Sequence, residues 1–98
     1  MAKFIVFEGI DGSGKSTQIR RLADALRDSG RQVYVTAEPT DMPSGRKIRE
    51  ALSGRVPTTT AEMADMFAID RVIHNTDSEQ GINLQLSLGK TVISDRYY

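Results

Sequence analysis

Short apolar runs alternate along the chain with longer segments in which apolar residues recur every three or four positions. Residues 3–8, 32–36 and 91–94 each have the length and composition of a buried strand. From residue 15 to about residue 29 the apolar side chains lie on one helical face, and Gly30 follows where a left-handed helix cap favours glycine. A strand, a helix and a strand in this order predict a right-handed parallel crossover.

Further helices are predicted between the second and third strands. Residues 44–52 form a short helix that ends before a Ser-Gly pair, and residues 80–88 form another that Gly89 closes. Between them, N-cap candidates at residues 58–60 begin a longer helix that runs to about Asn75.

The longer helix has two distinct faces. Its apolar stripe, which we expect to face the core, consists of Met66, Ile69 and Ile73. A second face carries Phe67, Asp70, Arg71 and His74 at positions i, i+3, i+4 and i+7. An aromatic ring one turn before an arginine suits a site in which the ring stacks on a base and the guanidinium donates to its edge. The alternative is a surface helix with one exposed phenylalanine and local ion pairs; in either case we expect His74 at the surface, with no role.

A glycine-rich segment joins the first strand to the first helix. Residues 9–16 match in full the phosphate-binding pattern G-x-x-x-x-G-K-S/T, in the strand–loop–helix context that the motif requires. Its glycines let backbone N–H groups surround phosphate oxygens, and the helix N-terminus favours the anion. Lys15 is expected to reach the β- and γ-phosphates, and the Ser16 hydroxyl to bind Mg²⁺. The residues predicted to bind ATP are Gly9, Ile10, Asp11, Gly12, Ser13, Gly14, Lys15, Ser16 and Thr17. A glycine-rich turn without a ligand is the alternative.

Two more polar clusters follow the second and third strands, namely Glu38-Pro39-Thr40 and Asp95-Arg96-Tyr97. Ligands of open α/β sheets bind outside the carboxyl ends of the strands. Asp95 has the position of an acid that serves Mg²⁺, and Arg96 could present a bidentate fork to a phosphate. A solvated ion pair is the alternative. Asp11 would point toward the phosphoryl acceptor, where a carboxylate could bind Mg²⁺, a sugar hydroxyl or nothing.

Composition limits the remaining function classes. The 98 residues include 13 basic and 13 acidic side chains, so no overall field favours nucleic acid or an anionic membrane. The absence of cysteine excludes disulfides, thiolate nucleophiles and cysteine zinc sites. No leader peptide or apolar stretch of membrane-spanning length is visible, so we expect a cytoplasmic protein. Nucleotide-binding α/β domains commonly run to about 150–250 residues. We therefore expect an incomplete three-layer α/β/α domain of the P-loop NTPase type, with a parallel sheet flanked by helices.

These motifs together resemble the thymidylate kinase family, whose members phosphorylate thymidine monophosphate with ATP in dTTP biosynthesis. Residues 7–18 resemble the opening signature of the family, Glu38-Pro39 its second-strand motif, residues 67–71 its base-contacting helix and residues 94–97 its third-strand motif. The resemblance implies ATP and dTMP as substrates, Mg²⁺ as the metal and a homodimer. On the acceptor side it implies that Phe67 stacks on thymine, Arg71 hydrogen-bonds it, Arg96 holds the monophosphate, Asp11 lies near the sugar and phosphate, and Glu38 supports the site. It also implies that Asp95 assists at Mg²⁺ or the acceptor phosphate, with Lys15 and Ser16 on ATP.

Two departures from the family pattern bear on the site. Gly12 stands where some members have an arginine, and the members without it supply that charge from a mobile lid late in the chain, which these residues do not include. Ala37 stands where the family often has another arginine. We therefore expect residues 1–98 to be the N-terminal half of one nucleoside monophosphate kinase domain, without the lid and the C-terminal part. The alternatives are a P-loop kinase with a different acceptor and a nucleotide-binding fragment without turnover.

Overall fold

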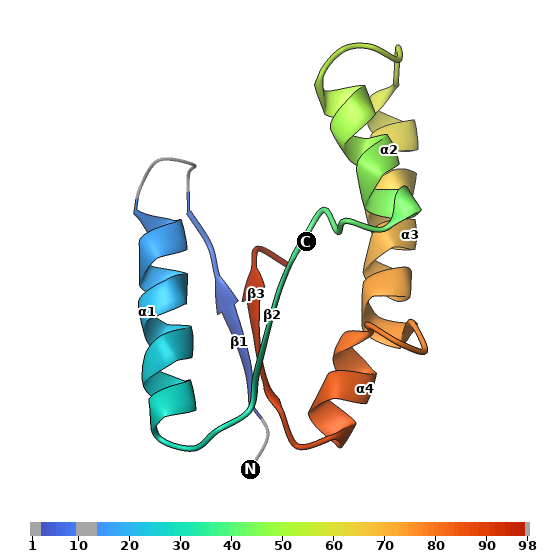
Figure 1. Ribbon diagram of the computed structural model, residues 1–98. Coiled ribbons are helices and arrows are strands. Elements are labelled where there is room, and N and C mark those ends of the chain that lie inside the picture. Colours follow the sequence, from blue (N-terminus) through green and yellow to red (C-terminus); the bar gives the residue numbers. More distant parts are fainter. Residues whose placement is uncertain (1–2, 10–13, 98) are drawn as a thin grey trace.

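A computed structural model describes residues 3–9 and 14–97 of the chain as three layers (Figure 1). Helix α1 (Lys15–Asp28) covers one face of a sheet, and helices α3 (Thr60–Thr76) and α4 (Ile82–Ser87) lie on the other side. The strands are β1 (Phe4–Phe7), β2 (Val33–Ala37) and β3 (Thr91–Asp95). Their order in the sheet is β1-β3-β2, and both outer strands pair with β3 in parallel. The predicted three-layer architecture is confirmed, and each of these elements begins and ends within two residues of its predicted bounds.

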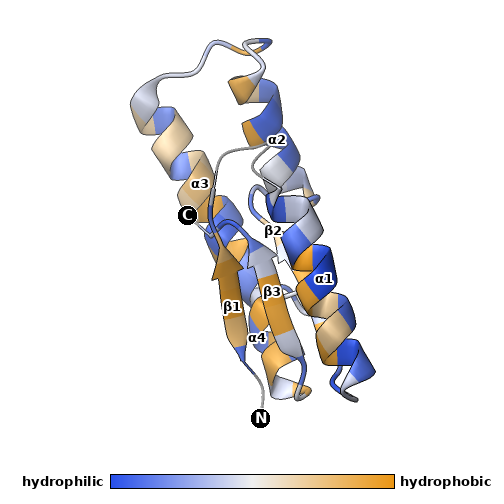
Figure 2. Cartoon of the chain, turned by 90° about the vertical axis from the view of Figure 1, so that its left-hand side faces the viewer, coloured by the Kyte–Doolittle hydropathy of each residue, from blue (hydrophilic) through white to orange (hydrophobic). Residues whose placement is uncertain are grey.

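The central strand β3 is buried on both faces, as expected for a parallel strand with helices on either side. Val92, Ile93 and Ser94 are fully buried. On one face Ile19 and Ala23 of α1 pack with Ile93, which confirms the predicted apolar face of α1. Each buried isoleucine contributes roughly 2 kcal/mol. Apolar colouring accordingly concentrates on β1 and β3 (Figure 2).

Local signals set the helix ends. Gly14 (φ 84°) precedes α1 and Gly30 (φ 92°) follows it, both in the left-handed region that glycine adopts readily. Helix α3 begins with a capping box, in which the Thr59 side chain accepts from the Glu62 N–H at 3.1 Å and the Glu62 carboxylate accepts from the Thr59 N–H at 3.0 Å. These hydrogen bonds lower the pKa of Glu62. The N-cap predicted between residues 58 and 60 is therefore Thr59.

Helix α2 (Pro43–Leu52) packs against α3, and the two extend past the carboxyl ends of the strands (Figure 1). The helix lies so close to the loop after β2 that a Cβ at Gly45 would sit 1.9 Å from the Thr40 carbonyl oxygen. Arg49 of α2 donates to the same oxygen at 2.7 Å and to the Pro39 oxygen at 2.5 Å. Glycine at position 45 therefore lets α2 lie directly against residues 39–40.

The predicted core face of α3 is wrong at Ile69, whereas Met66 and Ile73 are half-buried. Ile69 is 57% exposed, whereas Asp70 and His74 are each 1% exposed. The helix turns its polar face toward the loop after β2, where Asp70 accepts from the Thr40 N–H (3.0 Å), the Thr40 hydroxyl (2.6 Å) and the Ser44 hydroxyl (2.7 Å). Burial of Asp70 and His74 is possible because both side chains find hydrogen-bond partners. The expectation that His74 lies on the surface is wrong for the same reason, as is the alternative of a purely surface helix.

None of the described helices is both long and apolar enough to cross a bilayer.

Candidate functional site

The carboxyl ends of the three strands bring the predicted polar clusters to one edge of the sheet. The Glu38 N–H donates to the Asp95 carbonyl at 3.1 Å, and the Arg96 N–H donates to the Phe7 carbonyl at 2.7 Å. These bonds continue the sheet by one residue on either side of β3. As a result, the residues after β1, β2 and β3 lie next to one another.

Lys15, at the start of α1, is 5% exposed and points back to this edge. Its ammonium lies 2.7 Å from Oδ1 of Asp95 and donates to the Gly9 carbonyl at 3.3 Å. A buried ammonium needs such partners. The structure thus places together three predicted site residues, Gly9, Lys15 and Asp95. Predictions for Ile10, Asp11, Gly12 and Ser13 fall outside the described residues.

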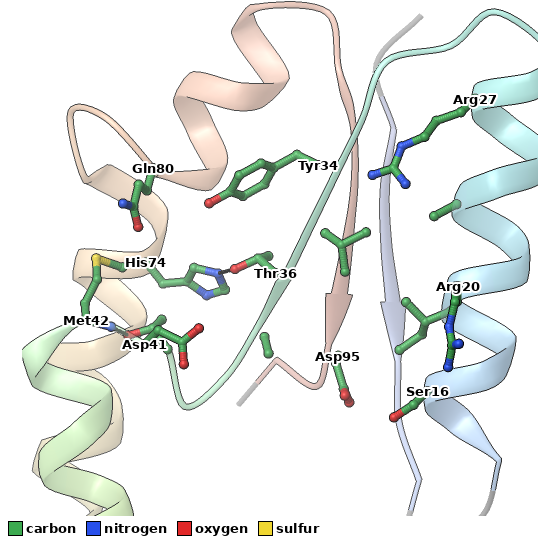
Figure 3. Close-up of a pocket in the computed structure, with 15 residues that line it drawn as sticks. Ser16, Arg20, Arg27, Tyr34, Thr36, Asp41, Met42, His74, Gln80 and Asp95 are labelled. Atoms are coloured by element: carbon green, nitrogen blue, oxygen red, sulfur yellow. Dashed lines mark hydrogen bonds between the residues drawn. The ribbon is translucent and has the colours of Figure 1, made fainter.

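A pocket of about 490 Å³ runs from α1 across β2 to α3. Ser16 and Asp95 line one end of it (Figure 3). Arg20 and Arg27 contribute from α1, and Tyr34 from β2. Burial, and then the charge of Asp77, raise the pKa of Tyr34.

Ser16 and Asp95 are the residues that fit a magnesium ion. Magnesium prefers oxygen ligands and usually takes only one or two from the protein, the rest being phosphate oxygens and water. Within residues 3–9 and 14–97, no three Asp, Glu, His or Cys side chains cluster as metal ligands. The hydroxyl and the carboxylate therefore suit an ion that is shared with a bound phosphate.

Arg96 has an unusual backbone conformation, with φ at 70°. Such a conformation is uncommon outside glycine and often marks functional sites. The Ser94 hydroxyl donates to the Arg96 carbonyl at 2.6 Å, and the Arg96 Nη2 donates to the Gly9 carbonyl at 3.1 Å. Its guanidinium therefore reaches the start of the phosphate-binding loop.

A second group of side chains surrounds Arg71 of α3. The Nε of Arg71 lies 3.2 and 3.3 Å from the two carboxylate oxygens of Glu38. Its guanidinium lies 3.5 Å from the centre of the Tyr97 ring. Asn75 hydrogen-bonds the Tyr97 hydroxyl at 2.9 Å, and Phe4 packs edge-on against the ring. Nη2 of Arg71 is buried and has no hydrogen-bond partner among the described residues.

Glu38 is itself held by residues that the sequence analysis did not assign to the site. It is 3% exposed, and its Oε2 lies 2.7 Å from Nδ1 of His74. Nε2 of His74 lies 2.7 Å from the Thr36 hydroxyl. The spacing of Asp70, Arg71 and His74 puts three polar groups on one face of α3, but it does not specify that this face meets the end of β2. Phe67 lies half-buried one turn before Arg71.

Comparison with known proteins agrees with this arrangement. A family model described as thymidylate kinase matches residues 7–98. The chain is similar to the thymidylate kinase of Desulfotalea psychrophila, with 46% identity over 96 residues that cover 98% of this chain and 46% of the relative. It is also similar to a probable thymidylate kinase of Thermococcus kodakarensis, with 43% identity over 97% of this chain and 49% of the relative.

A crystal structure of thymidylate kinase from Ehrlichia chaffeensis superposes with a TM-score of 0.79 at 33% identity, over 98% of this chain and 53% of that one. The chain thus spans about half the length of the curated relatives that it matches. The family model covers nearly all residues of this chain, and the Ehrlichia chaffeensis structure has the same fold over 98% of the chain. The chain belongs to the thymidylate kinase family.

Proposed function

We propose that the protein containing this chain transfers the γ-phosphoryl group of ATP to thymidine monophosphate. The bond from the γ-phosphorus to the bridging oxygen of ADP breaks, and a bond forms to a phosphate oxygen of the acceptor, which gives thymidine diphosphate and ADP. One observation carries the proposal: the Lys15–Asp95 pair and the arginine held by Glu38 lie at the same edge of one sheet. The relatives named thymidylate kinase support it.

The ATP side of the site is built on α1 and the end of β3. Lys15 would exchange its contact with Asp95 for phosphate oxygens and offset charge on the transferred group, since this chemistry depends mainly on positioning and charge neutralisation. Ser16 and Asp95 would hold Mg²⁺, which would supply further charge neutralisation when bound. The backbone of Gly9, Gly14 and Thr17 would contribute to the phosphate cradle.

The acceptor side is built on α3 and the end of β2. The Arg71 side chain is 25% exposed and is held by Glu38 and Tyr97, which suits donation from its accessible guanidinium N–H groups to a carbonyl oxygen of thymine. Phe67, one turn earlier, would stack on the base, and Arg96 would hold the monophosphate in line for attack. Asp11 would lie near the acceptor sugar and phosphate. Glu38 fixes Arg71 and is assigned the supporting role.

We also propose that residues 1–98 form the N-terminal half of one kinase domain in a cytoplasmic homodimer with no nucleic-acid or membrane partner. The half-length match to the relatives supports the first part. Exposed apolar residues on α3, Ile69 and Val72, support a subunit contact. Light scattering that gives a monomer mass at micromolar concentration would contradict the dimer.

The activity is tested with a coupled assay of ADP release in the natural polypeptide that contains these residues. With ATP and Mg²⁺ present, thymidine monophosphate should stimulate ADP release, and thymidine should not. Lys15→Ala should abolish this stimulation, because it removes the cation from the phosphates. Lys47→Ala, at an exposed position on α2, is the matched control and should behave as wild type. ATP binding without acceptor-stimulated release would instead indicate a nucleotide-binding module.

A further inference from the structure

A line of buried polar side chains connects β2 to Arg71. It runs from the Thr36 hydroxyl to Nε2 of His74, from Nδ1 of His74 to Oε2 of Glu38, and from Glu38 to Nε of Arg71. His74 is 1% exposed and Glu38 is 3% exposed, so water competes little for these bonds. The line ends at Arg71, the side chain that is proposed to bind the acceptor base.

The partners of His74 fix which nitrogen carries the proton. A carboxylate only accepts hydrogen bonds, so Nδ1 donates to Glu38. In the neutral imidazole Nε2 then accepts from the Thr36 hydroxyl. A ring flip would break both bonds, so the imidazole has one orientation and Glu38 one favoured position.

Two neighbours, Tyr97 and Glu38, together fix the orientation of the Arg71 guanidinium. Stacking on Tyr97 at 3.5 Å fixes the plane of the guanidinium but allows it to rotate within that plane. The bonds from Nε to Glu38 remove that rotation and fix the direction of the other guanidinium N–H groups. The direction in which Arg71 donates therefore depends on the position of Glu38, and Glu38 depends on His74.

We propose that His74 is a positioning residue that fixes Glu38 and, through it, the direction in which Arg71 addresses the acceptor base. The inference rests on the proposed function for its kinetic consequence, though not for the orientation of Arg71 itself. His74 is thus a determinant of acceptor affinity and base preference, without touching the substrate.

Two substitutions of similar polarity separate this role from simple packing. The amide nitrogen of asparagine lies at the same number of bonds from Cβ as Nδ1, so His74→Asn retains a donor toward Glu38. The end of glutamine corresponds to Nε2, so His74→Gln retains the contact with Thr36 and removes the donor to Glu38. Both variants are made in the natural polypeptide that contains these residues, and their thermal midpoints are compared.

The kinetic readout is the KM for each substrate. His74→Gln should raise the KM for thymidine monophosphate about tenfold, the factor expected for loss of one charge-assisted hydrogen bond, and should leave the KM for ATP within about twofold. It should also reduce the preference for thymidine over deoxycytidine monophosphate. His74→Asn should remain within about threefold of wild type on all three measures. Equal acceptor KM values in the two variants would overturn the proposal, whatever their thermal midpoints.

A spectroscopic readout keeps this test independent of turnover. The Nε–H of Arg71, assigned by its loss in Arg71→Lys, should give a protected ¹⁵N–¹H signal in wild type and in His74→Asn, and should broaden or disappear in His74→Gln. An unchanged signal in His74→Gln refutes the positioning role. If wild type shows no acceptor-stimulated ADP release, the proposed function fails, and this signal still decides whether His74 orients Arg71.

Discussion

Gly45→Ala tests the packing at the site, because helix propensity predicts a gain in stability and the structure predicts a loss. Position 45 lies in the first turns of α2, where alanine in place of glycine should stabilise a helix by about 1 kcal/mol. In the folded protein, however, the new Cβ would lie 1.9 Å from the Thr40 carbonyl oxygen and 2.5 Å from its nitrogen. Both neighbours are backbone atoms, so the loop or the helix has to move by more than 1 Å.

The cost of that movement follows from the bonds that hold Thr40. Its carbonyl accepts from Arg49 at 2.7 Å, and its N–H donates to the buried Asp70 at 3.0 Å. Loss of these two bonds to charged groups costs about 3 kcal/mol, and overpacking adds about 1–3 kcal/mol. After the propensity gain, we expect Gly45→Ala to lower the free energy of unfolding by about 3–5 kcal/mol.

Urea denaturation followed by far-ultraviolet circular dichroism measures this difference. Arg46→Ala, at the next and exposed position, is the control and should change stability by less than about 0.5 kcal/mol. A Gly45→Ala protein as stable as wild type, or more stable, would refute the close contact between α2 and residues 39–40.

Two further substitutions test the buried contacts and the N-terminal cap of α3. Both carboxylate oxygens of the buried Asp70 accept hydrogen bonds, and Asp70→Asn replaces one of these acceptors by a donor. It should therefore cost about 2 kcal/mol in urea denaturation, and a stability equal to wild type would contradict the three hydrogen bonds. The capping box lowers the pKa of Glu62, so its stabilisation is present above the unfolded-state pKa and is lost as pH falls through the folded-state value. Glu62→Gln, which removes the titrating carboxylate, should therefore destabilise the protein at neutral pH and reduce the loss of stability on acidification; identical pH profiles for the two proteins would count against the box.

The elements of this fold follow from local pattern, whereas the orientation of α3 does not. Ile19 and Ala23 alternate with charged residues at a clear helical period, and Thr59 with Glu62 forms a capping signal of four residues. In α3, by contrast, apolar and polar residues occur on several faces, and pattern alone favours Ile69 for the core. The polar face is buried instead because Thr36, Glu38 and Thr40, which are far away in sequence, supply hydrogen-bond partners for Asp70 and His74.

The same distant contacts explain how much of the site could be predicted. Short motifs next to the strands identify Lys15, Ser16 and Asp95 from the sequence. The structure brings these three residues together, as predicted. The roles of His74 and Tyr97 depend on which side chains α3 meets across the sheet edge, and no local spacing specifies that. The strand order β1-β3-β2 likewise depends on pairing across most of the chain length.

The two halves of the site rest on different parts of the fold. Lys15 and Ser16 are carried by α1, which packs on the sheet. Glu38 and Thr40 belong to that loop, which Arg49 of α2 and Asp70 of α3 hold in place. A change in the α2–α3 pair should therefore reach Arg71 through Glu38 while the phosphate loop stays as it is. For this reason the ratio of acceptor KM to ATP KM, rather than turnover alone, reports on the network around His74.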